Sequence, residues 1–384
     1  MRLILAIIGT TLFCNVSAAQ WTRQQSGTTA RLRGLAVVNA KVVWASGAQG
    51  TYVRTTDGGI TWKSATVPGA VDLDFRDVHA ADEHKAFLLS IGAGEKSRIY
   101  HTADGGNTWA LRFINHDPRG FLDAIAFWDD DHGIAMGDPV DGRFTILTTG
   151  DGGVNWKKSP SELMPLAEKS EGAFAASGTC LVVQGDRNAW FGTGGAAVSR
   201  VFRTADRGQT WTVDETPIVA ASPSSGIFSL AFRDQNEGVA VGGDYKNPAQ
   251  SNRVVALTAN GGRTWTLPKG RGPGGYRSGV VYVPGSAQPT LVAVGPTGSD
   301  LSTDGGQSWM PLGTLGFHTV GFAGPTDGGW GAGDDGIIAK IRGALPTTAD
   351  FNAARPTTER GSVSPRPLAL SEAASLCLPA RDMR

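Results

Sequence analysis

A phrase of eight residues that occurs six times constrains the fold of this 384-residue chain more than any other feature. Its first copy, at residues 55–62, runs Thr-Thr-Asp-Gly-Gly-Ile-Thr-Trp. The other copies end at later tryptophans: Trp109, Trp156, Trp211, Trp265 and Trp309. The copies follow one another at intervals of 44 to 55 residues. Because repeats of roughly 40 to 50 residues are typical of β-propeller blades built from four short strands, the sequence predicts an all-β propeller.

Composition agrees with this fold class and limits the partners. The chain contains 53 glycines and 11 tryptophans, which favours many tight turns with aromatic side chains packed beneath them. Its 35 Lys and Arg residues equal its 35 Asp and Glu residues. A neutral chain lacks the positive field that nucleic-acid binding usually needs, so we expect no nucleic-acid partner.

Seven segments share the pattern of a first strand, one more than the six phrases. In each segment small residues alternate with large apolar ones, which sends the two sets to opposite faces of a sheet. The segments begin at Arg33, Arg76, Asp123, Ser177, Phe228, Arg277 and His318. The last one is followed by residues 330–341 without a phrase, and residues 20–23 hold an unassigned Trp21. We therefore predict a seven-bladed β-propeller of four-stranded antiparallel blades over residues 20–343, its last blade closed by the N-terminal strand.

The two ends of the chain differ from this domain. Arg2, an apolar run at residues 3–13 and small residues at 16–19 predict a signal peptide over residues 1–19, and hence a periplasmic or secreted protein. Residues 344–384 are rich in proline and predict a disordered tail. We expect no membrane span, because no later stretch is apolar and long enough. The remaining Cys180 and Cys377 form no metal or redox motif, so we expect no metal and no cofactor.

The candidate ligand site lies at the mouth of the channel on the face opposite the repeated turns. Arg277, His318, Arg33 and Arg76 occupy the first strand position in consecutive blades, which predicts a cationic arc for an acidic ligand. Six further residues are expected on this face: Asp123, Asp138, Glu171, Asp244, Tyr245 and Tyr276. The alternative is that the arc is solvated surface paired with acids such as Asp72 and Asp74.

The repeated phrase resembles the Asp-box, also called the BNR repeat. In that family it forms the turn between the third and fourth strands of a blade. An aspartate side chain accepts hydrogen bonds from nearby backbone amides, glycine permits a positive φ, and tryptophan packs beneath the turn. We expect these aspartates to stabilise turns rather than to perform chemistry.

One resemblance is to sialidases, which also contain Asp-boxes. It implies that Arg33, Arg76 and Arg277 hold a substrate carboxylate. It also implies a Tyr276 nucleophile assisted by Glu171, with Asp123 transferring a proton. The Arg-Ile-Pro phrase of sialidase N-termini is absent, and sialidases have six blades where the sequence predicts seven.

The span from Trp21 to Ile341 is more similar to the photosystem II stability/assembly factor-like family, in its uncharacterised bacterial branch. The phrases that carry the resemblance lie at residues 121–127, 138–142, 171–179 and 243–245. It implies an exported propeller with a binding or assembly role. We therefore expect a monomeric scaffold for a protein partner or a small acidic ligand. A sialidase-like glycoside hydrolase is the alternative.

Overall fold

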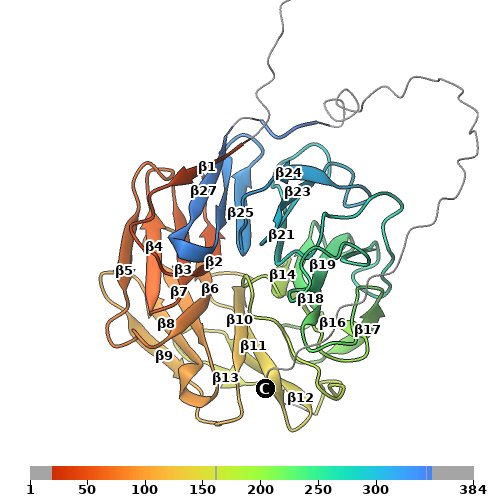
Figure 1. Ribbon diagram of the computed structural model, residues 1–384. Coiled ribbons are helices and arrows are strands. Elements are labelled where there is room, and N and C mark those ends of the chain that lie inside the picture. The colour runs from red at the N-terminus through yellow and green to blue at the C-terminus, as the bar shows by residue number, and fades with distance from the viewer. Residues whose placement is uncertain (1–19, 161, 343, 348–384) are drawn as a thin grey trace, which may run out of the picture. The chain divides into compact units, whose positions relative to one another are not determined.

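The chain folds into seven antiparallel sheets arranged around a ring (Figure 1). The computed structural model describes residues 20–160, 162–342 and 344–347, so the predicted signal peptide and most of the predicted tail lie outside the described residues. The first strands of neighbouring blades contact one another all the way round, including the contact of the last blade with the first. Within those ranges, no helix has the length and apolar character needed to cross a membrane.

The blades follow one another in chain order. Blade 1 contains β2 (Leu32–Val37), β3 (Val43–Gly47), β4 (Thr51–Thr55) and β5 (Lys63–Thr66). Blade 2 contains β6 (Asp74–Ala80), β7 (Ala86–Ile91), β8 (Arg98–Thr102) and β9 (Ala110–Ile114), with the 3-10 turn η1 (Gly94–Lys96). Blade 3 contains β10 (Leu122–Phe127), β11 (Gly133–Val140), β12 (Arg143–Thr149) and β13 (Lys157–Lys158). Blade 4 contains β14 (Leu181–Gln184), β15 (Asn188–Gly192), β16 (Ser199–Thr204) and β17 (Thr212–Thr216).

The remaining blades complete the ring. Blade 5 contains β18 (Ser225–Phe232), β19 (Gly238–Asp244) and β20 (Val255–Thr258). Blade 6 contains β21 (Gly279–Tyr282), β22 (Leu291–Gly295), β23 (Gly298–Ser302) and β24 (Met310–Gly313). Blade 7 contains β25 (Thr319–Gly324), β26 (Gly328–Ala332), β27 (Ile338–Arg342) and the N-terminal β1 (Gln20–Gln24), with the 3-10 turn η2 (Asp334–Gly336).

The N-terminal strand closes the last blade, as predicted. β1 pairs antiparallel with β27, and Trp21 lies opposite Ile341. The Trp21 ring packs on Phe317 with a centroid distance of 4.7 Å, and its Nε1 donates a hydrogen bond to the Ser299 hydroxyl at 2.9 Å. The first strand of the structure thus belongs to the last sheet and also contacts blade 6.

Two blades differ from the predicted regularity. Blade 4 begins its first strand at Leu181 rather than at Ser177, because the preceding residues bond to other blades. Blade 5 has three strands among the described residues, and its fourth is reduced to a bridge between Leu257 and Thr266.

The apolar core lies between neighbouring blades rather than at a single centre. Met136 and Phe144 of blade 3 pack with Phe191 and Phe202 of blade 4 in one such cluster. Small residues permit this close stacking: a Cβ on Gly321 of blade 7 would lie 2.8 Å from the Val37 side chain of blade 1. The predicted alternation of small and large residues thus corresponds to the packing of one sheet on the next.

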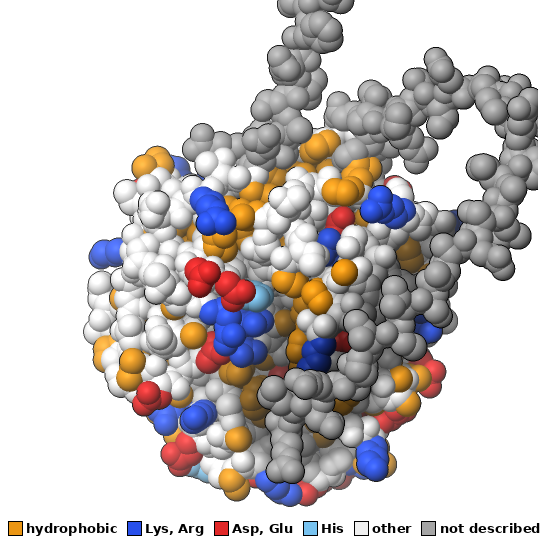
Figure 2. Space-filling view, in the orientation of Figure 1, with side chains coloured by type: hydrophobic (Ala, Val, Ile, Leu, Met, Phe, Trp, Pro, Cys, Tyr) orange, Lys and Arg blue, Asp and Glu red, His pale blue; other side chains and the backbone are white. Residues whose placement is uncertain are grey.

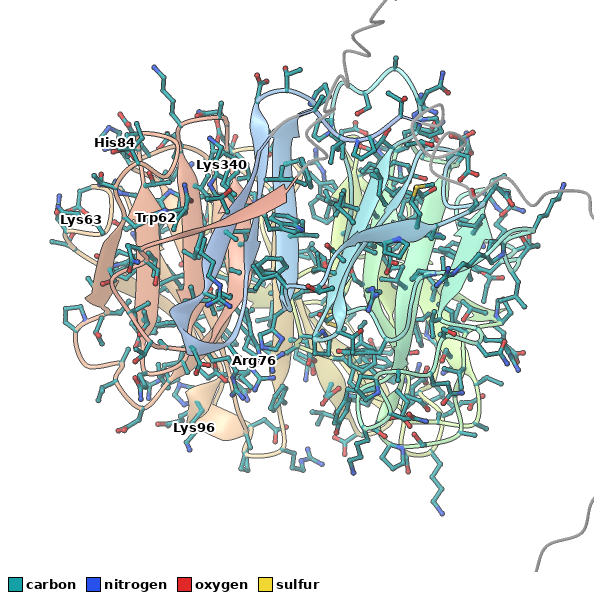
Figure 3. The ribbon with its side chains drawn as sticks, turned by 45° about the horizontal axis from the view of Figure 1, so that its top comes forward. Trp62, Lys63, Arg76, His84, Lys96 and Lys340 are labelled. Carbon is teal, nitrogen blue, oxygen red and sulfur yellow. The ribbon has the colours of Figure 1, made fainter. Side chains whose placement is uncertain are left out.

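The six repeated phrases form turns with one hydrogen-bond network. In the first turn the Thr55 hydroxyl accepts from the amide of Gly59 at 2.9 Å, and Asp57 accepts from the amide of Thr61 at 2.9 Å. The corresponding acceptors in the other turns are Asp104, Asp151, Asp206, Asn260 and Asp304. Figure 3 shows Trp62, His84 and Lys340 toward one end of the strands and Arg76 and Lys96 toward the other, so the turns and Arg76 lie on opposite faces.

Candidate functional site

A pocket of about 440 Å³ opens on the face that carries Arg76, which we call the pocket face. It is lined by Arg33, Arg76, Phe121, Asp123, Asp138, Ala173, Phe174, Ala175, Ala176, Phe228, Tyr245, Tyr276, Pro296 and His318. Figure 2 shows basic, acidic and histidine side chains gathered near the centre of the face toward the viewer. A larger hollow of about 820 Å³ lies along the closing strand, and none of the predicted site residues lines it.

The chain that leads into blade 4 crosses the mouth of the channel, and we call residues 172–180 the crossing segment. On one side, the amide of Ala173 donates to Asp138 Oδ1 of blade 3 at 2.9 Å. On the other, the carbonyl oxygen of Ala175 accepts from Arg76 of blade 2 at 3.1 Å. The pocket is therefore bounded by this segment rather than open through the ring.

Farther along, the crossing segment bonds to blades on the other side of the ring. The Thr319 hydroxyl of blade 7 donates to the carbonyl oxygen of Ser177 at 3.2 Å. The hydroxyl groups of Thr179 and Ser229, the latter in blade 5, lie 2.6 Å apart. These contacts use the backbone and side chains that would otherwise begin the first strand of blade 4, which explains the late start of β14.

Two arginines form the basic side of the pocket. Arg76 is paired with Asp74, with 2.9 Å between Nε and Oδ2. Arg33 donates to the carbonyl oxygen of Ala176 at 3.3 Å, and its Nε is buried with no hydrogen-bond partner among the described residues. Burial, followed by the positive charges of Arg76 and Arg31, lowers the pKa of Arg33 to about 10. Arg33 thus remains charged at neutral pH while lacking a carboxylate partner of its own.

Two carboxyl groups form the opposite side. Asp123 is 1% exposed, and its Oδ2 has no hydrogen-bond partner in the described part of the chain. Burial and the neighbouring Asp138 carboxyl raise the pKa of Asp123 well above its usual range, although Arg76 opposes the shift. Burial also raises the pKa of Asp138 to about 6, against the hydrogen bond from Ala173. The two carboxyl groups therefore titrate as a pair that retains a proton near neutral pH.

Aromatic rings complete the wall. Phe174 of the crossing segment stacks on Phe228, with 3.9 Å between centroids and an interplanar angle of 11°. Tyr276 meets Phe228 edge-on at 4.7 Å, and Tyr245 beside it is 47% exposed. Phe174 was not among the residues predicted for the site. Its only signal was a large aromatic residue within a run of alanines, and its position depends on the unforeseen path of the crossing segment.

Seven of the predicted site residues line the pocket: Arg33, Arg76, Asp123, Asp138, Tyr245, Tyr276 and His318. Three do not. Arg277 is buried in an ion pair with Asp300, with 2.6 Å between Nε and Oδ2. Glu171 is buried against Arg200, with 2.9 Å between Oε1 and Nε. Asp244 accepts from the amide of Lys246 at 2.9 Å and ends β19.

The cationic arc is smaller than the sequence predicted. Arg277 contributes no free charge to it, because Asp300 neutralises its guanidinium within the protein. Burial and the nearby Arg33 lower the pKa of His318, although Asp334 opposes the shift, so this imidazole is neutral at neutral pH. The basic side of the pocket thus consists of Arg33 and Arg76. Over the described residues, no group of three or more His, Cys, Asp and Glu side chains is placed to hold a metal ion.

The Tyr–Glu pair that the sialidase resemblance implies is not formed. Both carboxylate oxygens of Glu171 are engaged, one by Thr193 and Arg200 and the other by Arg200 and the amide of Glu168. The Tyr276 ring instead packs edge-on against Phe228. The pocket therefore joins a basic side, an acidic side and an aromatic wall, which suits a ligand with both charged and apolar groups.

Comparisons with known proteins support the fold. No protein-family model and no curated protein sequence matches the chain. The structure of YCF48 bound to D1 peptide is similar, with a TM-score of 0.58 and 18% identity over 85% of this chain and 95% of that one. YCF48 from Cyanidioschyzon merolae gives a TM-score of 0.60 with 17% identity over 84% and 98% of the two chains. An ancestral GH74 enzyme gives 0.61 with 13% identity over 86% and 46%. At these identities the likenesses establish the propeller fold.

Proposed function

We propose that this chain is an exported propeller scaffold that binds a carboxylate-bearing segment of a protein partner in the pocket of the pocket face. The observation that carries the proposal is Arg33, a half-buried cation whose Nε is itself buried without a partner in the described structure and which lies beside a second arginine. A carboxylate that binds there gains a charge-assisted hydrogen bond and reduces the repulsion between Arg33 and Arg76.

The burial of this site decides how much an arginine contributes. A hydrogen bond to a charged group contributes about 1.5–3 kcal/mol, whereas an exposed ion pair contributes at most about 1 kcal/mol. The Nε atom of Arg33 is buried although the residue as a whole is half-buried, so a carboxylate that reaches this atom makes an interaction of the stronger class. Arg76 already binds Asp74 and adds a weaker contribution.

A protein segment is the ligand that the pocket shape and the comparison favour. The pocket of about 440 Å³ has room for a few side chains of a longer chain, and its aromatic wall suits their apolar parts. YCF48, which shares the fold, is described as bound to D1 peptide.

Export is supported by Arg2, the apolar run at residues 3–13 and the small residues at 16–19. The mass of the mature protein tests export, since cleavage after Ala19 would leave Gln20 as its first residue.

A displayed library of random peptides tests the binding function. Selection on the native protein should enrich Asp and Glu, and binding of the selected peptides should weaken with added salt. The Arg33→Gln and Arg76→Gln double variant should lose this enrichment. Arg263→Gln is the matched control, because Arg263 lies in a repeated turn on the opposite face. Equal selection of acidic residues by the double variant and the native protein would overturn the proposal.

A further inference from the structure

We propose that Asp123, Asp138 and the Phe174 ring form a second subsite of the same pocket, which takes an ammonium or guanidinium group. This inference rests on the proposed function for the carboxylate half of the ligand. It adds that the bound segment carries a lysine or arginine side chain close to its acidic residue.

The acidic side of the pocket has a hydrogen-bond acceptor without a donor. Asp123 is 1% exposed and lines the pocket, and nothing in the described chain donates to its Oδ2. A buried acceptor left unsatisfied costs about 1–3 kcal/mol, more when the group is charged. Asp138 also lines the pocket, and the Ala173 amide fixes its Oδ1. A ligand group that donates hydrogen bonds to the acidic side of the pocket would therefore meet two carboxyl groups at once.

The charge balance favours a cation over a neutral donor. Burial and the Asp138 carboxyl raise the proton affinity of Asp123, and Arg76, which opposes this shift, is itself paired with Asp74. A hydroxyl group would satisfy the free oxygen but would not compensate the negative charge that develops when the pair loses its proton. An ammonium or guanidinium group does both, because it donates hydrogen bonds and supplies a positive charge.

The groups around the pair do not supply this charge themselves. Those that face it or lie across the pocket are Arg76 and Asp77 of β6, Cys180 of the crossing segment, Arg33, Tyr276 and His318. Asp77 is an acidic residue and supplies no positive charge. It is buried and accepts backbone hydrogen bonds from Val78 and Ile125. His318 is turned to Asp334 at 2.8 Å. Burial of Cys180 raises its pKa, which keeps it neutral.

The aromatic wall belongs to the same pocket as the acid pair. Phe174 follows Ala173, the residue whose amide binds Asp138, and Phe174 lines the pocket together with Asp123 and Asp138. Stacking on Phe228 holds this ring in one position. A cation over an aromatic face gains about 0.5–2 kcal/mol, more when water is excluded. Phe174 thus contributes both to the affinity for a cation and to packing of its apolar stem.

The same displayed library distinguishes the two halves of the pocket. Selection on the native protein should enrich Lys or Arg at a fixed spacing from Asp or Glu. Asp123→Asn and Asp138→Asn should lose the basic enrichment and keep the acidic one. Asp141→Asn is the matched control, because Asp141 lies in the same blade but pairs with Arg119 at the exposed surface. Melting temperatures close to that of the native protein would show that the variants fold.

The possible outcomes of the selection distinguish failure of the cation subsite from failure of the proposed function. Acidic enrichment without basic enrichment would overturn the cation subsite and leave the proposed function standing. Enrichment of Ser or Thr in place of Lys or Arg would mean a hydroxyl subsite and would also overturn it. No enrichment of any kind would overturn both proposals. Basic enrichment that survives both aspartate substitutions would place the cation elsewhere and overturn the assignment.

Calorimetry on a selected peptide gives a second readout. Replacing its basic residue by norleucine should weaken binding to the native protein by roughly tenfold or more, but should hardly affect binding to Asp123→Asn. Binding of the basic peptide should also release protons from the acid pair, in a number that falls in Asp138→Asn. Equal losses in native and variant proteins would overturn the subsite.

Discussion

The Nη1 atom of Arg33 in blade 1 lies 3.3 Å from the carbonyl oxygen of Ala176, in the segment that leads into blade 4. Together with the bond from Arg76 to Ala175, this contact ties blades 1 and 2 to a loop that belongs to the other side of the ring. The two arginines therefore line the pocket and also hold the segment that bounds it. Changes to the crossing segment should affect the ligand site as well as stability.

Gly178 tests whether the crossing segment is held tightly. It has a φ of +78°, and a Cβ on it would lie 2.1 Å from Asp77 Oδ1. We expect Gly178→Ala to lower the free energy of unfolding by roughly 2–4 kcal/mol through backbone strain and this clash. Thermal or denaturant unfolding measures the change.

Gly69 provides the control for that substitution. Its φ of +74° is similar, but no heavy atom would lie within 4 Å of its Cβ. Gly69→Ala should therefore cost only the backbone term, about 1–2 kcal/mol. Equal losses in the two variants would show that the crossing segment moves freely away from Asp77.

The buried Glu171–Arg200 pair is expected to fix the start of the crossing segment. Glu171→Gln should destabilise the protein by about 3–5 kcal/mol, because the partly buried Arg200 is left without its counter-charge. Glu237→Gln breaks the exposed pair with Arg233 and should change stability by less than about 1 kcal/mol. Urea unfolding of both variants compares them, and a loss at Glu171 no larger than at Glu237 would contradict a structural role.

The repeated turns made most of the fold predictable. Each turn depends on contacts within a few residues, as between Thr55, Asp57 and Thr61, so a local pattern marks it. The number of blades followed from the seven segments in which small and large residues alternate, because that alternation determines how the sheets stack. Closure by Trp21 followed from two observations. The last blade lacked a fourth strand in the sequence that follows it, and the segment around Trp21 belonged to no other blade.

The site was only partly predictable because it depends on contacts distant in sequence. The first-strand position placed Arg33 and Arg76 correctly at the pocket, yet the same rule failed for Arg277, whose charge is used by Asp300 on another strand. No local sequence pattern indicates the pairing of Arg277 with Asp300. Ser177 and Thr179 lie in a segment with the alternation of a strand, but they bond to blades 7 and 5. The path of this segment, and with it the position of Phe174, could therefore not be predicted.

Trp21 tests the closure of the ring. Trp21→Ala should lower the free energy of unfolding by about 2–4 kcal/mol, because it removes the packing on Phe317 and the hydrogen bond to Ser299. Trp21→Phe retains an aromatic ring and should cost less, about 1–2 kcal/mol. Calorimetric melting measures both. Native-like stability of the alanine variant would mean that β1 contributes little to closure.

The repeated turns should stabilise the fold without taking part in binding. Asp57→Ala removes the acceptor for the Thr61 amide and should lower the melting temperature by a few degrees. Asp57→Asn should be milder, since Asn260 forms the same network with Thr264 in the fifth turn. Peptide binding per folded molecule should be unchanged in both variants. A stable variant that no longer binds would place the ligand on the face of the turns.

The acid pair should give the protein a pH-dependent stability of definite sign. Burial raises the pKa of Asp138 to about 6, whereas an unfolded aspartate titrates near 3.9. Between about pH 4 and 6 the folded state therefore binds more protons than the unfolded state, and the free energy of unfolding falls as the pH rises through this window. Asp138→Asn cannot titrate, but its amide oxygen can still accept from Ala173. The stability of this variant relative to the native protein should increase by roughly 1–3 kcal/mol from pH 4.5 to 7.5.

The difference between native and variant proteins is the quantity to measure, because groups remote from the acid pair titrate equally in both. His79 and His101, whose pKa values burial lowers to about 4, are such groups. Asp141→Asn is the control: Arg119 lowers the pKa of Asp141, so its contribution is complete above about pH 5 and is lost only toward more acidic pH. Urea unfolding at several pH values should thus give a rising difference for Asp138→Asn and a flat one for Asp141→Asn above pH 5. A flat difference for both would mean that Asp138 is ionised throughout, and the acid pair would then hold no shared proton for a bound cation to displace.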